Sequence, residues 1–252
     1  MMNITPVVKQ LLIINIIFFI GSQFVANAYP LFSLYYPESP NFRVWQPLTS
    51  MFMHAPMPNL MHIVFNMFAL VSFGSALEHF WGAKKFIFFY ISCGLGAALL
   101  HTAFGYYQFH IGLENLKAIG CEDQLASFLK TGNLSFSVRP PNMNVEALGN
   151  MFNAYNTPSL GASGAIYGLL TAFAFMFPMA ELGIMFIPIP IKAKYFVPGL
   201  IAVDLFLGFS GNSLFGAGGT GIAHFAHVGG AVTGFIMMWF WKKNQFNKNR
   251  WN

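Results

Sequence analysis

The chain has 252 residues, of which 56% are hydrophobic and only 8% are charged. Soluble globular proteins carry roughly 25% charged residues, so this composition excludes an ordinary soluble fold. The net charge of +5 comes from basic residues in short connections between apolar blocks, without the long basic stripe that a nucleic-acid partner needs. Two cysteines, Cys93 and Cys121, are too few for a disulfide framework and leave the redox compartment open.

Six apolar blocks approach the length of about 20 residues that a helix needs to cross roughly 30 Å of hydrocarbon. They predict an all-α membrane protein with spans at about residues 8–29, 60–80, 86–107, 160–177, 195–209 and 222–241. The first block has a second interpretation, because Lys9, the apolar run after it and Ala26-Asn27-Ala28 resemble a cleaved secretory signal. A retained span is favoured, since the apolar character continues through Ala26.

The 13 basic residues fall unevenly on alternate connections. Nine share one side: Lys9, Lys84, Lys85, Lys192, Lys194, Lys242, Lys243, Lys248 and Arg250. Because Lys and Arg collect in cytoplasmic loops, we expect both termini in the cytoplasm and a place in the cell membrane. Residues 108–158 are then a long non-cytoplasmic loop or a small lid, with no chemistry assigned to it.

The connection between the first two blocks, residues 30–58, is as aromatic as the spans but is broken by six prolines. Aromatic side chains prefer the headgroup level of a bilayer. We expect this connection to lie in the interface without crossing.

Polar residues inside spans are expensive, so each one is a functional hypothesis. Ser163 stands among small residues where the fourth block begins, in the segment GASGAIYG. Unpaired N–H groups and the positive end of the helix dipole meet at such a place, which suits a developing oxyanion. Gly164 and Gly168 also form a G-x-x-x-G packing motif, so a purely structural role stays open at this point.

The sixth block places His227 on one helical face with a second pair of glycines, Gly230 and Gly234. If the two glycine faces press together, His227 comes beside Ser163. A neutral imidazole next to a serine hydroxyl is what activation of a nucleophile requires.

His62 and Asn66 lie four residues apart on the second block, so their side chains emerge on one face. Imidazole and carboxamide N–H groups are uncharged donors that suit an oxyanion hole. Taken alone, such a pair is more often polar glue between helices.

These motifs, in this order, resemble the rhomboid intramembrane serine proteases over nearly the whole core. The signatures are GASGAIYG at residues 161–168, AHVGGAVTG at 226–234 and HIVFN at 62–66. The resemblance implies a six-helix rhomboid-like bundle around a water-accessible cavity that opens to the outside.

The same resemblance implies a role for each matching residue. Ser163 would be the nucleophile and His227 the base and then the acid, with Tyr167 packed against the histidine ring. The Ser163 N–H, His62 and Asn66 would hold the oxyanion. No cofactor or metal is implied; the expected partners are protein substrates with transmembrane segments, and lipid.

The chain departs from the family where the first connection commonly has Trp-Arg and here reads Trp45-Gln46. The lost guanidinium removes a structural anchor, for which Arg43 is a partial substitute by position. The departure bears on stability of the connection more than on catalysis.

Other polar residues are given no part in catalysis. Asp204 is interpreted as a packing or hydrogen-bonding group rather than a third catalytic member, and Glu78 as structural. His224 and His227, with His54 and His62, are weighed as metal ligands and set aside, because a zinc site leaves the serine signature unexplained.

The sequence therefore predicts an intramembrane serine endopeptidase with a Ser-His dyad. The alternative is a catalytically silent rhomboid-like protein that only binds transmembrane helices, although such proteins usually lack the serine or the histidine, and both are present here. A transporter is disfavoured because few paired charges are available along a pathway. The oligomeric state and the natural substrate do not follow from the sequence.

Overall fold

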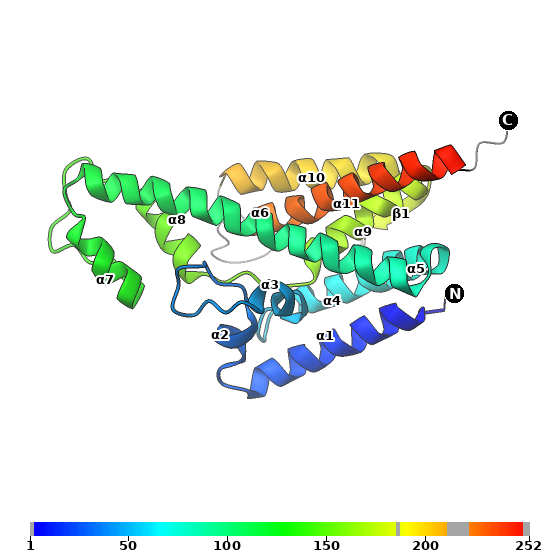
Figure 1. Ribbon diagram of the computed structural model, residues 1–252, viewed down its shortest axis with the longest axis horizontal. Coiled ribbons are helices and arrows are strands. Elements are labelled where there is room, and N and C mark those ends of the chain that lie inside the picture. The colour runs from blue at the N-terminus through cyan, green and yellow to red at the C-terminus, as the bar shows by residue number, and fades with distance from the viewer. Residues whose placement is uncertain (1–2, 185–186, 211–221, 249–252) are drawn as a thin grey trace.

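The computed structural model describes residues 3–184, 187–210 and 222–248. Helices occupy all six ranges in which spans are expected (Figure 1). They are α1 (Pro6–Phe24), α4 (Leu60–Ala69) continued by the π-helical turn η2 (Leu70–Gly74) and α5 (Ser75–Trp81), α6 (Ala83–Ala118), α9 (Ser163–Met176), α10 (Ala193–Ser210) and α11 (Ile222–Lys248).

Four helical stretches among the described residues are long and apolar enough to cross a bilayer: α1, residues 60–81, α6 and α10. Helix α9 is apolar but has only 14 residues. Large apolar side chains face outward from these helices, and Leu99 and Phe206 are each 72% exposed. Lipid is the solvent that suits such a surface. The chain is thus an integral membrane protein, and the expected all-α membrane fold is confirmed, whereas the number of spans stays a prediction.

Helices α6, α9 and α11 pack pairwise against one another at the centre of the molecule. Glycines allow this approach. A methyl group at Gly230 would lie 1.8 Å from the carbonyl oxygen of Gly164, and one at Gly234 would lie 2.9 Å from the backbone of Gly168. The two glycine faces therefore meet backbone to backbone, which fixes how the residues on α9 and α11 face each other.

Helix α1 is joined to the rest of the bundle through Glu78, a buried residue on α5. Its carboxylate accepts hydrogen bonds from the Thr5 hydroxyl at 2.5 Å and from the backbone N–H groups of Val7 and Val8 at 2.9 Å. The first N–H groups of a helix have no acceptor within the helix, and the helix dipole favours a negative charge there. These contacts are those of a structural residue, as the sequence suggested.

Helix α6 is much longer than the expected span at residues 86–107, because it continues to Ala118. Its 36 residues extend about 54 Å, well beyond the hydrocarbon thickness of roughly 30 Å. Two further helices, α7 (Asp123–Thr131) and α8 (Val145–Asn156), lie within the segment expected as a long loop.

The end of α6 shares a second hydrophobic core with α7 and α8. Its buried members are Tyr36, Phe109, Leu116, Phe128, Leu148, Met151 and Tyr155. Figure 1 shows α7 and α8 at the opposite end of the molecule from the start of α1 and the end of α11. We call α7, α8 and residues 109–118 the cap; it is a packed helical unit rather than an irregular loop.

The connection after α1 contains three short helices: α2 (Ala28–Phe32), α3 (Gln46–Thr49) and the 3-10 turn η1 (Ser50–Phe52). Gln46 is fully buried at its centre and donates from Nε2 to the carbonyl oxygens of Pro30 and Asn41, at 2.9 and 2.8 Å. Its Oε1 accepts from the Tyr35 N–H at 3.2 Å. The expectation that Arg43 partly substitutes for the family arginine is wrong, because among the described residues its guanidinium donates to the neighbouring carbonyls of Pro40 and Phe42 alone. Gln46 itself is the anchor.

An antiparallel hairpin that the sequence did not suggest joins α9 to α10. Its strands are β1 (Glu181–Ile184) and β2 (Ile187–Lys192), with Glu181 opposite Lys192. Figure 1 shows β1 at the same end of the molecule as the start of α1.

Candidate active site

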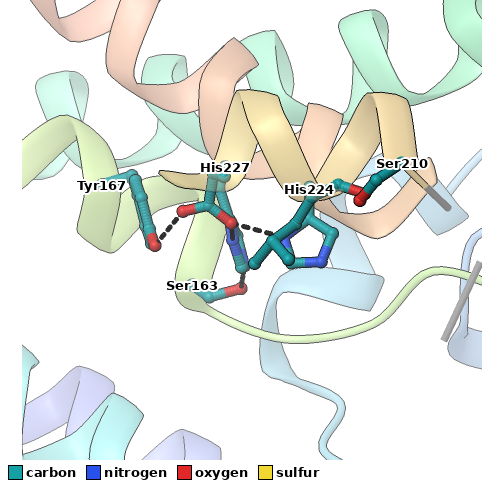
Figure 2. A network of polar contacts seen from close by, with 7 residues as sticks. Ser163, Tyr167, Ser210, His224 and His227 are labelled. Carbon is teal, nitrogen blue, oxygen red and sulfur yellow. Dashed lines mark hydrogen bonds and ion pairs between the residues drawn. The ribbon is translucent and has the colours of Figure 1, made fainter. Parts of the chain in front are cut away.

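Ser163 and His227 face each other across the glycine contact between α9 and α11. Ser163 is the first residue of α9, and its Oγ lies 2.9 Å from Nε2 of His227 (Figure 2). Both side chains are partly exposed, so water and substrate can reach them. The structure thus brings together two residues that are 64 positions apart in the sequence.

The contact of Nδ1, the other ring nitrogen of His227, determines which nitrogen of the imidazole carries the hydrogen. Nδ1 lies 3.0 Å from Oδ1 of Asp204, on α10. An ionised carboxylate only accepts hydrogen bonds, so Nδ1 is the protonated nitrogen and Nε2 is left as the acceptor for the Ser163 hydroxyl. This is the arrangement in which a histidine acts as a general base towards serine.

Asp204 is buried, and its carboxylate has several donors. Oδ1 also accepts from Nδ1 of His224 at 2.5 Å, while the Tyr167 hydroxyl donates to Oδ2. Such bonds offset the cost of removing a charge from water. The sequence interpretation gave Asp204 a packing or hydrogen-bonding role away from catalysis; the structure instead places it on the catalytic candidate His227. A signal was available, because Asp204 is the one acid in the fifth apolar block and a charge inside a span needs partners.

Tyr167 contacts two members of the site. Its ring stacks on the imidazole of His227, with centroids 4.3 Å apart and planes 9° from parallel. Since its hydroxyl also donates to Asp204, one side chain orients both the histidine and the carboxylate. The packing that the family resemblance implied for Tyr167 is present, and the bond to Asp204 adds to it.

His62 also lies close to Ser163. Its Nδ1 accepts from the backbone N–H of Ala55 at 3.1 Å, so a neutral ring carries its hydrogen on Nε2. A methyl group at Gly161 would lie 2.9 Å from this Nε2 and 3.5 Å from Oγ of Ser163. Gly161 has φ 124°, where residues with side chains are strained, so the chain there is shaped by glycine. The Nε2–H donor and the hydroxyl thus border the same small space.

Asn66 is buried one helical turn after His62 and donates from Nδ2 to the His62 carbonyl at 2.8 Å. A carboxamide nitrogen has a second hydrogen. The Ser163 N–H, at the first position of α9, has no acceptor within its own helix. A shared oxyanion hole of His62, Asn66 and the Ser163 N–H stays a prediction.

The segment before Ser163 is held by the connection after α1. Leu34 and Ser159 exchange two backbone hydrogen bonds of 2.8 Å, and the Gly161 N–H donates to the Ser50 carbonyl at 2.9 Å. His54, in the same connection, packs on the ring of His62 with centroids 5.2 Å apart. Burial, followed by the neighbouring His62 ring, lowers the pKa of His54 to about 3, so His54 is uncharged near neutral pH.

Asp204, His224 and His227 present ligand atoms that lie within 4.8 Å of one another. The sequence grouped His224 and His227 with His54 and His62 as weighed metal ligands. The structure separates this set, since His54 and His62 pack together beside Ala55 while His224 and His227 share Asp204.

Comparison of the sequence with known proteins identifies one matching family. The family model described as "Rhomboid domain" matches residues 41–114 and 143–244. "Rhomboid protein 1, mitochondrial" from Saccharomyces cerevisiae is 27% identical over 161 residues, covering 58% of this chain and 42% of the yeast protein. "RHOMBOID-like protein 12, mitochondrial" from Arabidopsis thaliana is 27% identical over 199 residues, covering 79% of this chain and 47% of the plant protein. The matched part is less than half the length of either relative.

Proposed function

Because the chain belongs to the rhomboid family, we propose that it is an intramembrane serine endopeptidase that cuts transmembrane segments of other membrane proteins. The observation that carries this proposal is the hydrogen-bonded chain from Ser163 through His227 to Asp204, with distances of 2.9 and 3.0 Å. A serine, a base and a group that orients the base are the parts that nucleophilic acyl transfer needs.

The reaction follows from the tautomer of His227. Nε2 takes the hydroxyl proton as Ser163 Oγ attacks the scissile carbonyl, and Asp204 stabilises the imidazolium that forms. In this proposal, the His62 Nε2–H and the Ser163 N–H donate to the tetrahedral oxyanion. His227 then gives the proton to the leaving amine, and water hydrolyses the acyl-enzyme by the same route in reverse.

The competing function is a silent rhomboid-like protein that binds transmembrane helices without cutting them. A protein freed from catalysis has no need to keep a tautomer-fixing carboxylate on a histidine beside a serine. The contacts of His227 with both Ser163 and Asp204 therefore favour the enzyme.

The proposed substrates are transmembrane segments presented from the surrounding lipid.

The orientation and location of the protein belong to the proposal as well. We place it in the cell membrane with both termini in the cytoplasm. The start of α1, the end of α11 and the hairpin before Lys192 share one end of the molecule, which supports a common side for them (Figure 1). Both relatives carry "mitochondrial" in their names, so a mitochondrial membrane is the competing location.

The test is cleavage of a transmembrane test substrate by the purified protein in liposomes. Ser163→Ala is expected to lower the rate by about 10⁴-fold or more, and His227→Ala to a similar extent, because residues that act as a unit fail together. Ser135→Ala, which removes an exposed hydroxyl between α7 and α8, is the matched control and keeps the wild-type rate. A Ser163→Ala protein that cuts at the wild-type rate would contradict the proposal.

A further inference from the structure

The far side of His227 from Ser163 is a compact group of metal-ligating atoms. Asp204 Oδ1 lies 2.5 Å from Nδ1 of His224 and 3.0 Å from Nδ1 of His227, and all three ligand atoms lie within 4.8 Å of one another. Figure 2 shows the two imidazoles side by side, with Ser163 beyond His227. The hydrolytic mechanism uses His227 and Asp204 and gives His224 no step.

These distances suit zinc with little movement. Tetrahedral zinc with bonds of about 2.0–2.1 Å separates its ligand atoms by roughly 3.3 Å. Side-chain adjustments on the order of 1 Å would bring the three atoms to that spacing. Imidazole nitrogen and carboxylate oxygen are both accepted zinc ligands, and the Tyr167 hydroxyl on Oδ2 would hold the carboxylate for coordination through Oδ1.

An ion can reach this group from the solvent. The side chains of His224 and His227 are 12% and 24% exposed, and that of Asp204 is 6% exposed. The two histidine side chains are thus not fully sealed in the helix bundle.

From this geometry we propose that Asp204, His224 and His227 form a zinc site whose occupation switches the serine off. The inhibitory part rests on the proposed serine-protease function, whereas binding does not. The site is built from three helical residues on α10 and α11, and its occupant competes directly with the hydrogen bonds that prepare His227.

The inhibition follows from the two tautomers of one ring. Without metal, His227 carries its hydrogen on Nδ1 and offers the Nε2 lone pair to Ser163. Zinc needs a free lone pair on Nδ1, so the hydrogen that Nδ1 of His227 carried moves through solvent to Nε2. His224, which also carries its hydrogen on Nδ1, changes tautomer in the same way. Nε2–H of His227 then donates to Ser163 Oγ and accepts nothing. No proton is gained or lost overall, and no redox partner is needed, but the base is gone.

The first measurement is cleavage by the full chain, freed of metal by dialysis against a chelator and then titrated with zinc chloride. Because a general base contributes about 10²–10⁴ to the rate, saturating zinc should slow cleavage by roughly 100-fold or more, and added chelator should restore it. Magnesium chloride is the control ion and has no effect, since Mg²⁺ prefers oxygen ligands.

The second measurement is zinc binding to Ser163→Ala, read by competition with a zinc-responsive dye. This variant keeps all three ligands, so the measurement does not depend on activity. Loss of a residue that merely orients a ligand costs about 10–100-fold in affinity, so adding His224→Ala should weaken binding by about 100-fold or more. His79→Ala, at an exposed histidine on α5, is the matched control and leaves binding unchanged.

A third variant separates lost ligation from lost folding. His224→Cys supplies a different zinc ligand at the same position, so it should retain zinc binding where His224→Ala does not. Inhibition by zinc is compared with the zinc-free rate of each variant, whatever that rate is.

The outcomes are distinct. Tight zinc binding that His224→Ala removes, together with inhibition that a chelator reverses, supports the proposal. No zinc binding by Ser163→Ala, or binding that His224→Ala leaves unchanged, overturns it. Activity that appears only with zinc overturns it too and makes the site a catalytic metal centre, while absence of cleavage under all conditions contradicts the proposed function and leaves the binding result to decide the site.

Discussion

Two buried carboxylates, Glu78 and Asp204, each 4% exposed, differ in the groups that surround them. Glu78 accepts hydrogen bonds from a hydroxyl and two backbone N–H groups at the start of α1. Asp204 accepts hydrogen bonds from the imidazoles of His224 and His227 and from the phenol of Tyr167. Of these groups, the His227 imidazole also contacts Ser163. Backbone donors keep their protons throughout, whereas an imidazole gains and loses a proton in a reaction. Burial of an acid inside a membrane protein therefore says little about its role until its donors are known.

The comparison is sharpest when the same chemical change is made at both sites. Asp204→Asn keeps the size of the side chain but removes the charge that fixes the tautomer of His227. We expect the cleavage rate to fall by about 10²–10⁴-fold. The midpoint of thermal unfolding should change less than it does in the matched variant Glu78→Gln. Steady-state cleavage in liposomes measures the loss; a variant with wild-type activity would return Asp204 to a packing role.

The next largest loss of turnover is expected at the candidate oxyanion donors, His62 and Asn66. His62→Ala removes the Nε2–H donor beside Gly161, and removal of one oxyanion donor typically costs about 10²–10³ in turnover, or roughly 3–4 kcal/mol. Asn66→Ala is expected to slow turnover as well. In both variants a fluorophosphonate probe should still label Ser163. If neither variant changes turnover, these side chains serve only to hold helices together.

Glu78→Gln is the matched change at the structural carboxylate. Hydrogen bonds to a charged group contribute about 1.5–3 kcal/mol, so the free energy of unfolding should fall by an amount in that range. Activity below the unfolding transition should stay close to that of the wild type. A Glu78→Gln protein that unfolds normally but is inactive would mean that the two carboxylates do not divide the roles as described.

The smallest expected effect is at Gln46, in the connection after α1. Gln46→Leu leaves the carbonyls of Pro30 and Asn41 without their donor, which should lower the free energy of unfolding by about 1–2 kcal/mol. Arg43→Ala, at an exposed residue with local contacts, should change it by less than about 0.5 kcal/mol. Thermal unfolding in detergent compares the two, and equal losses would show that Gln46 is no special anchor.

Much of this arrangement could be predicted from the sequence because glycines carry geometric information. Glycine pairs on two apolar helices indicate where backbones meet, and the position of Ser163 beside Gly164 then places it against His227. The partners of Asp204 could not be predicted in this way. The fifth block is apolar on all sides, so no periodicity indicates which face of it points inward.

The helices of the cap and the anchoring role of Gln46 could not be predicted from the sequence, for different reasons. Mixed polar sequence at residues 108–158 hides the few apolar residues, such as Phe128 and Met151, that form the second core. From the sequence, Gln46 was interpreted as the loss of an anchor, because it lacks the guanidinium of the family arginine. Only the structure shows that four backbone groups lie within hydrogen-bond reach of the shorter Gln46 amide.

The most direct test of the account is the rate at which a fluorophosphonate labels Ser163 in wild type, Asp204→Asn and Glu78→Gln, measured side by side at one pH. Labelling requires a serine activated by its base and does not depend on knowing the substrate. We expect slow labelling in Asp204→Asn and a wild-type rate in Glu78→Gln. Equal rates in all three proteins would contradict the claim that Asp204 prepares His227 to activate Ser163.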